Sequence, residues 1–187
     1  MFPATGMLPV AAPRDFPAAI ARGILAILLG CALFTPGCAP REENVAAPAD
    51  RKFAVSLGDR TVHVELAVTQ EETSRGLMFR ESLEEDSGML FVFRDPRRMS
   101  FYMLNTPIPL DIGYFSAAGI LREVYALHPF DENIVPSQSA RIQFALEMEQ
   151  GWFSANGIRR GAQLDLEEIA AALRARGFPP EDFGLGE

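Results

Sequence analysis

The sequence predicts an all-β domain, a sandwich or a barrel, with one or two short helices and a C-terminal helix extension. Two observations lead to this fold class. Apolar residues alternate with polar or small ones over residues 61–68, which is the pattern of a half-buried strand. Short apolar stretches then recur along the chain with turn residues between them. Such spacing favours a sandwich or barrel over a βαβ fold.

We expect seven short strands. In residues 61–68, Val64 and Leu66 belong to the apolar face, whereas His63 and Glu65 belong to the opposite one. Pairs such as Asp95-Pro96 and Ala118-Gly119 mark turns between strands. The expected strands are residues 52–57, 61–68, 89–93, 99–104, 110–115, 120–127 and 141–148.

Two short helical stretches are expected before the C-terminal region. Thr69, with Glu72 three residues later, forms a capping box. It predicts a helix that begins there and runs through Phe79. Residues 150–157 suggest one further helical turn, which ends at Gly157.

The C-terminal region carries the clearest helix signal. Asp165 is a good N-cap, Glu168 stands at the third helical position, and Gly177 follows an alanine-rich interior. Residues 178–187 are expected to form a loose tail.

The N-terminus reads as a targeting segment. Residues 24–34 are apolar, but a bilayer-spanning helix needs about 20 residues, so the run fits the apolar region of a secretory signal. Cys38 behind it resembles the lipobox cysteine of bacterial lipoproteins and is the expected lipidation site. Cys31, ordinary signal cleavage and an uncleaved anchor remain alternatives. The chain could start at Met1 or Met7.

These features predict an exported protein of the periplasm or outer envelope, held to the membrane by its lipid or signal segment. Both cysteines lie in the targeting segment, so the mature domain has no disulfide and no thiol nucleophile. We expect no cofactor. The two histidines, His63 and His128, stand in no metal-binding motif, so we expect no metal. A net charge of −8 argues against a nucleic-acid partner.

Several ordered motifs resemble the bacterial and archaeal family known as domain of unknown function 192. The resemblance implies a compact, jelly-roll-like β domain and no established activity. One departure is Leu104, where the family usually has a lysine between Met103 and Asn105. The motifs are GLM at 76–78, GML-F at 88–91, M-x-N-T at 103–106, LDI at 110–112, and Glu147 followed by Gly151.

The domain organisation follows from these observations. We expect a signal segment at 1–38, a flexible tether rich in Ala, Pro and charge at 39–51, the β domain at 52–164, and a C-terminal helix and tail at 165–187.

Several polar residues stand among apolar ones and are candidates for a site. Asp111 and Glu147 are the candidates for acid–base catalysis, a role that requires two carboxylates at a fixed separation. A structural role is the one we favour for each, because a carboxylate on a buried strand commonly pairs with an arginine. The candidate binding residues are Arg75, Arg80, Asn105, Thr106, Asp111 and Trp152.

Three functions remain open on the sequence alone. The one we favour is a binding or interaction module for a small molecule or an envelope partner, rather than an enzyme. The first alternative is an envelope hydrolase that acts on a glycan through Asp111 and Glu147. The second is a structural lipoprotein without a ligand, which the absence of a pocket would support.

Overall fold

A computed structural model describes residues 46–186. The predictions about the signal segment, Cys31, Cys38 and the first part of the tether fall outside the described residues. Within the described range, no helix is both long enough and apolar enough to cross a membrane.

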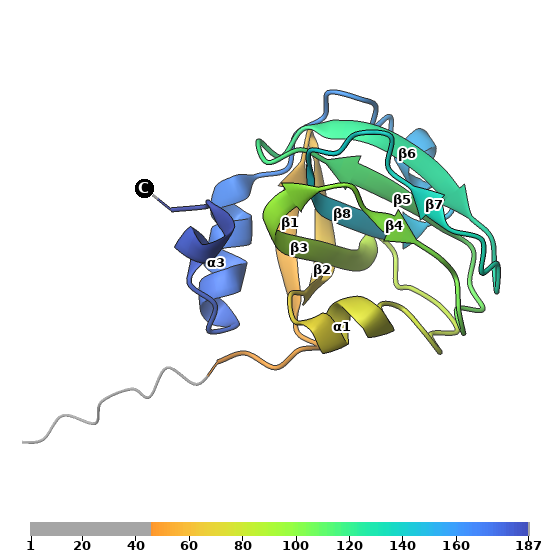
Figure 1. Ribbon diagram of the computed structural model, residues 1–187, viewed down its shortest axis with the longest axis horizontal. Coiled ribbons are helices and arrows are strands. Elements are labelled where there is room, and N and C mark those ends of the chain that lie inside the picture. The colour runs from red at the N-terminus through yellow and green to blue at the C-terminus, as the bar shows by residue number, and fades with distance from the viewer. Residues whose placement is uncertain (1–45, 187) are drawn as a thin grey trace, which may run out of the picture. The chain divides into compact units, whose positions relative to one another are not determined.

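The fold is mostly β, as predicted, and is built on one large mixed sheet (Figure 1). The six strands of this sheet follow the order β1-β2-β3-β8-β5-β6, and β4 pairs with β7 in a separate two-stranded sheet. The order of the large sheet ends at β1 on one side and β6 on the other, so these strands describe an open sheet, not a closed barrel. The strands are β1 (Lys52–Leu57), β2 (Arg60–Ala67), β3 (Ser87–Arg97), β4 (Ser100–Phe101), β5 (Leu110–Phe115), β6 (Leu121–Leu127), β7 (Val135–Pro136) and β8 (Ile142–Glu149).

One β-α-β unit departs from the pattern that the sequence suggested. β2 pairs with β3 in parallel, and helix α1 (Gln70–Arg75) lies in the connection between them. Parallel neighbours need such a crossover connection. The remaining pairs in the large sheet are antiparallel.

The N-terminal ends of helices α1 and α3 lie where the sequence predicted them. Thr69 caps α1: its hydroxyl accepts from the N–H of Glu72 at 3.2 Å, and the Glu72 carboxylate accepts from the N–H of Thr69 at 3.0 Å. The predicted extension to Phe79 was wrong, because Gly76 takes a φ of 48° and ends the helix. Helix α2 (Trp152–Ala155) is the expected helical turn.

Helix α3 (Leu166–Ala175) begins at its predicted cap, Asp165, whose carboxylate accepts from two backbone N–H groups. The expected loose tail was wrong. It forms a 3₁₀ turn, η1 (Pro180–Phe183), and the Phe183 side chain is buried in the core.

Two strands differ from prediction by more than two residues at one end, and one strand was not predicted. β3 continues through Asp95 and Pro96, with an irregularity in its pairing beyond Val92. The strand expected at 99–104 shortens to β4, because the chain turns at Asn105, where φ is 53°. The two-residue strand β7 was not predicted.

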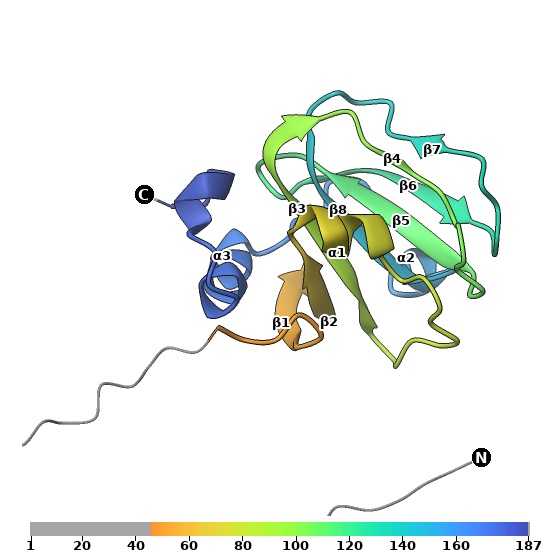
Figure 2. The same cartoon turned by 60° about the horizontal axis from the view of Figure 1, so that its bottom comes forward.

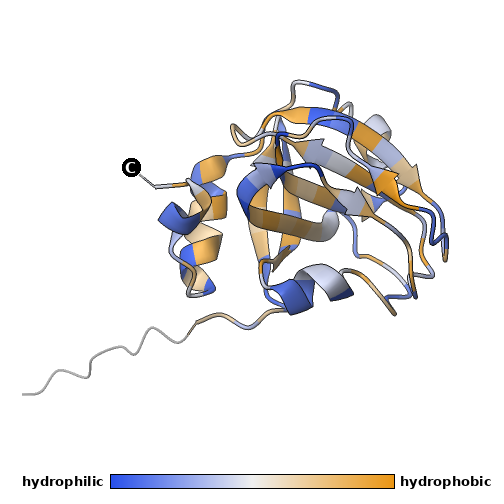
Figure 3. Ribbon diagram, in the orientation of Figure 1, coloured by the Kyte–Doolittle hydropathy of each residue, from blue (hydrophilic) through white to orange (hydrophobic). Residues whose placement is uncertain are grey.

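The large sheet is buried on both faces. One face packs beneath α3 and η1, with Val64, Leu90 and Leu173 in a single cluster. The other face packs against β4 and β7, with Phe91 and Ile112 in a second cluster. Figure 3 shows hydrophobic orange segments along the sheet strands, whereas α1 is blue at both ends and pale between them, with no orange.

Candidate functional site

The main candidate site is a cleft of about 450 Å³ on the β4 side of the sheet. We call it the Glu147 cleft. The end of α1 and the loop after it form one wall, and β3 and β4 form others. Figure 2 shows α1 in front of β3 and β8.

Much of the cleft wall is aromatic or apolar. Phe91, Phe93 and Phe101 line it together with Met78 and Met99. The Phe91 and Phe101 rings meet edge to face, with centroids 4.8 Å apart. A wall of this kind favours a ligand with an apolar body.

Three arginines also line the cleft: Arg75, Arg97 and Arg98. All three are exposed. The guanidinium of Arg97 lies 4.2 Å from the centre of the Phe93 ring, a cation–π contact. Among the described residues, no carboxylate forms an ion pair with any of the three.

Glu147 is the one acidic residue that lines the cleft. It lies on β8 and is only 5% exposed. No enclosed polar side-chain atom of residues 46–186 lacks a hydrogen-bond partner. The Glu147 carboxyl oxygens have no hydrogen-bond partner among these residues, so they are not fully enclosed and open toward the cleft that Glu147 lines. Burial raises the pKa of Glu147 to about 8, so this side chain is largely a neutral carboxylic acid at pH 7.

A second buried glutamate shares a row of side chains with Glu147. Glu65 on β2 pairs with Met89 on β3, and Met89 pairs with Glu147 on β8. Paired residues on neighbouring strands face the same side, so both carboxylates lie on the cleft side of the sheet, two strand spacings apart. Glu65 differs in having a partner, because the Arg80 guanidinium donates to it at 2.7 Å.

The sequence did not single out Glu65 as a site residue. Apolar and polar residues alternate regularly along its strand, so the face that carries Glu65 was expected to face solvent. In fact Glu65 is buried. The available signal was Ala67, a small apolar residue on that same face.

The pairing of Asp111 with Glu147 as acid and base is contradicted by strand register. Asp111 pairs with Met148, whereas Glu147 pairs with Ile112. Adjacent residues of a strand point to opposite faces, so the two carboxylates lie on opposite sides of the sheet. They cannot flank one glycosidic bond, which removes the observation that favoured a glycan hydrolase.

Asp111 instead supports the turn between β8 and α2. Its carboxylate accepts from the N–H of Gly151 at 2.8 Å, and Gly151 has a φ of 90° at the start of α2. Burial raises the pKa of Asp111, and the Gly151 hydrogen bond partly offsets this effect. No ion pair joins Asp111 to an arginine within residues 46–186.

The remaining predicted residues divide between the cleft and the framework. Thr106 lines the cleft, and its hydroxyl donates to the Leu104 carbonyl at 3.1 Å. Asn105 is exposed and takes the left-handed conformation that asparagine tolerates better than most residues. Trp152 is nearly buried, and its indole N–H donates to Asp86 at 2.8 Å, so it supports the fold.

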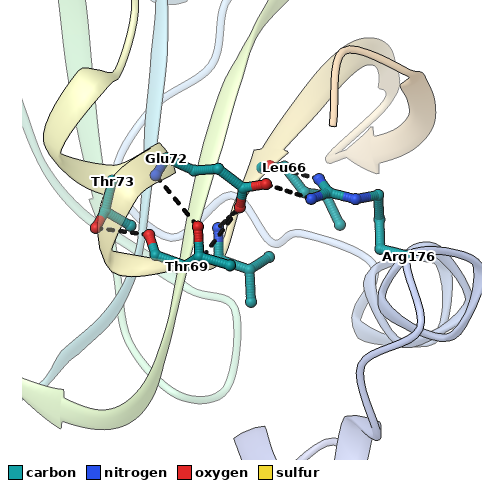
Figure 4. Close-up of polar contacts among 6 residues, drawn as sticks. Leu66, Thr69, Glu72, Thr73 and Arg176 are labelled. Atoms are coloured by element: carbon teal, nitrogen blue, oxygen red, sulfur yellow. Dashed lines mark hydrogen bonds and ion pairs between the residues drawn. The ribbon is translucent and has the colours of Figure 1, made fainter. Parts of the chain in front are cut away.

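The α1 wall of the cleft is held by polar contacts. α1 has no buried residue. The Glu72 carboxylate accepts from the N–H of Val68 at 2.9 Å and pairs with Arg176, which also donates to the Leu66 carbonyl at 2.9 Å (Figure 4). Burial alone would raise the pKa of Glu72, but these hydrogen bonds and the guanidinium hold it below its usual value.

The arrangement can bind a small molecule and orient it. The neutral carboxylic acid of Glu147 can donate a hydrogen bond, and the guanidinium groups on the other walls can donate hydrogen bonds to an anionic group. Within residues 46–186 there is no cluster of three or more His, Cys, Asp or Glu that could hold a metal ion.

The chain is similar to known proteins in both structure and sequence. Two solved structures resemble the chain, each at 29% sequence identity. A protein from Sinorhizobium meliloti 1021, described as a proposed transcription regulator, has a TM-score of 0.60, and the match covers 64% of this chain and 97% of that one. A protein of unknown function from Novosphingobium aromaticivorans DSM 12444 has a TM-score of 0.59, with 65% and 94% covered.

The comparison with curated proteins gave no match. The family model described as DUF192, uncharacterized ACR, matches residues 53–166. This range confirms the resemblance that the GLM, GML-F, M-x-N-T and LDI motifs carried. The chain belongs to the DUF192 family.

Proposed function

We propose that the protein is an exported, lipid-anchored binding module of the cell envelope, and that the Glu147 cleft is its ligand site. The observation that carries the binding role is Glu147 itself. A carboxyl group that is 5% exposed, with no protein partner among the described residues, lies open to a cleft of about 450 Å³. Burying such a group is costly unless something hydrogen-bonds to it, and a ligand would supply that contact.

The cleft also weighs against a structural lipoprotein without a ligand. Its volume falls within the usual range of small-molecule sites, about 300 to 1,000 Å³. Its lining combines aromatic and apolar side chains with three arginines and one glutamate, and small-molecule sites likewise join apolar surface to polar groups that orient the ligand.

A fragment screen on the 15N-labelled full chain tests the binding role. The variant Ser74→Trp would fill the cleft from α1, since Ser74 is exposed and lines it. Ser82→Trp is the matched control, because Ser82 is exposed in the next loop and does not line the cleft. We expect fragments to shift cleft resonances in the wild type and the control, and not in Ser74→Trp. Binding that Ser74→Trp leaves unchanged, or no binding at all, would contradict the proposal.

Export and anchoring rest on the apolar run at 24–34 and on Cys38. We expect the wild-type chain in the membrane fraction of a bacterial host, with a mature mass that corresponds to cleavage before a lipid-modified Cys38. Cys38→Ser should abolish the modification, whereas Cys31→Ser should not. An intact, unmodified chain in the cytosol would refute this part of the proposal.

We propose no nucleic-acid partner, although one structural neighbour is described as a proposed transcription regulator. The net charge of −8 supports this view, because nucleic-acid affinity rests largely on phosphate contacts from basic residues.

A further inference from the structure

The geometry points to a specific class of ligand for the Glu147 cleft: a small organic carboxylate with an apolar or aromatic body. The ligand carboxylate would accept hydrogen bonds from the arginines and from the protonated carboxyl group of Glu147. This inference rests on the binding role proposed above and goes beyond it, because it fixes the charge and shape of the ligand.

The charge of the cleft favours an anionic ligand. Three arginines line the cleft, against one glutamate. None of the three is paired with a carboxylate anywhere in residues 46–186. The protein as a whole is acidic, with a net charge of −8, so this concentration of unpaired guanidinium groups is local. Arginine presents a planar fork that fits carboxylate oxygens.

Glu147 also favours an anionic ligand. If it were ionised, it would attract a cation, but the three arginines would repel that same cation at the cleft walls. As a neutral acid it offers an O–H donor, and an anionic oxygen is the acceptor that gains most from such a donor. The anionic ligand therefore satisfies both the arginines and Glu147, whereas a cationic ligand satisfies Glu147 alone.

The aromatic and apolar wall of the cleft favours a ligand with an apolar body. Phe91, Phe93 and Phe101 contribute aromatic surface, and Met78 and Met99 add adaptable apolar surface. A bare inorganic anion would leave this surface in contact with water. A carboxylate with an aromatic body would cover it.

The protonation of Glu147 provides a readout that a purely structural residue would lack. Its pKa is raised by burial to about 8. Tyr114 stays protonated well above this pH, because burial and nearby carboxylates raise its pKa further, and arginines stay charged. The charged and titratable groups that line the cleft are Arg75 from α1, Arg97 from β3 and Arg98 just beyond it. Those on the same face of the sheet as Glu147 are Tyr114 from β5, Tyr125 and its hydrogen-bond partner Glu123 from β6, and the Glu65–Arg80 pair.

The test measures the binding of four probes to the 15N-labelled full chain by NMR and calorimetry. They are 3-phenylpropanoate, its neutral amide 3-phenylpropanamide, the cation 3-phenylpropylamine, and acetate, which lacks the apolar body. We expect 3-phenylpropanoate to bind most tightly and to shift the resonances of Gly76 and Ser100, both of which line the cleft.

Variants connect binding to the named groups. The double variant Arg75→Gln, Arg98→Gln should weaken 3-phenylpropanoate binding roughly tenfold, as expected for lost charge-assisted hydrogen bonds. Arg60→Gln is the matched control, because Arg60 is exposed and does not line the cleft. Wild-type affinity should fall about tenfold between pH 7 and pH 9 as Glu147 loses its proton. Glu147→Gln keeps a donor but cannot ionise, so its affinity should stay constant over this range.

Several outcomes would overturn the inference. Tighter binding of the amine in the cleft would exclude the anionic class while leaving the binding role intact. Equal binding of acetate and 3-phenylpropanoate would show that the cleft does not select a ligand with an apolar body. Failure of all four probes would also refute the carboxylate class, and the fragment screen would then decide the binding role separately. Equal pH dependence in the wild type and Glu147→Gln would show that Glu147 does not donate to the ligand.

Discussion

Replacing Glu147 by glutamine should make the protein more stable at neutral and mildly alkaline pH. In the unfolded chain the Glu147 carboxyl releases its proton near its ordinary pKa of 4.5, whereas in the folded protein burial holds the proton to about pH 8. Between these values the native state binds one more proton than the unfolded state. Stability must therefore fall as the pH rises through this window.

The size of the effect follows from the same two values. One pKa unit corresponds to about 1.4 kcal/mol. The wild type should thus lose roughly 4 to 5 kcal/mol of unfolding free energy from this group between pH 4.5 and pH 8. Glutamine has nearly the same shape and does not ionise, so Glu147→Gln should avoid this loss. The two proteins should match near pH 4.5 and diverge by that amount at pH 8.

Urea unfolding at pH 5, 6, 7 and 8 measures this difference. All other titrating groups are common to both proteins, so their contributions cancel when the two free energies are subtracted. Glu149→Gln is the matched control, because Glu149 lies on the same strand and is exposed. Its stability difference from the wild type should stay nearly constant with pH. A constant difference for Glu147→Gln as well would refute the reasoning, because it would mean that Glu147 ionises in the folded protein as freely as in the unfolded chain.

Three further substitutions test the framework around the cleft, each by urea unfolding at pH 7. Asp111→Asn should change stability by no more than about 1 kcal/mol, because the amide oxygen can still accept the one hydrogen bond that Asp111 receives. Arg176→Ala should cost roughly 2 to 4 kcal/mol, since it leaves the partly buried Glu72 carboxylate without its guanidinium. Gly88→Ala should cost about 2 kcal/mol or more, because a Cβ there would stand 2.1 Å from the backbone oxygen of Glu147.

Each of these substitutions has an outcome that would contradict it. A loss above about 3 kcal/mol for Asp111→Asn would mean that Asp111 has an ionic partner, which it lacks within residues 46–186. Wild-type stability in Arg176→Ala would show that Glu72 is adequately solvated alone. Wild-type stability in Gly88→Ala would mean that β3 and β8 can separate at no cost.

Elements with local signals were predictable from the sequence. The capping box at Thr69 and the N-cap at Asp165 act within one helical turn, so both helices begin where the sequence placed them. Parallel pairing of β2 with β3 depends on contacts between distant segments. No local pattern specifies such contacts, and the β-α-β unit was accordingly missed.

The candidate site shows the same division. Asp111 and Glu147 looked equivalent in sequence, because each is a carboxylate within a buried strand. Their roles depend on register: a one-residue shift in pairing exchanges the two faces of a strand. The Ile112–Glu147 pairing places Glu147 on the cleft side and, by the same alternation, Asp111 on the other. Register in a central strand is set by its neighbours, so the sequence of one strand could not decide which carboxylate reaches the cleft.

The C-terminal extension has a role in the cleft that its position in the sequence does not suggest. The family model ends at residue 166, whereas Arg176 lies beyond it. α1 contributes Arg75 to the cleft but has no buried residue of its own, and elements with little apolar burial are the first to open. The contacts of Glu72 with Val68, Thr69 and Arg176 replace that missing burial. In this member of the family, the extension therefore supports the α1 wall of the cleft through Arg176. If the cleft binds a ligand as proposed, Arg176→Ala should weaken that binding, although Arg176 does not line the cleft.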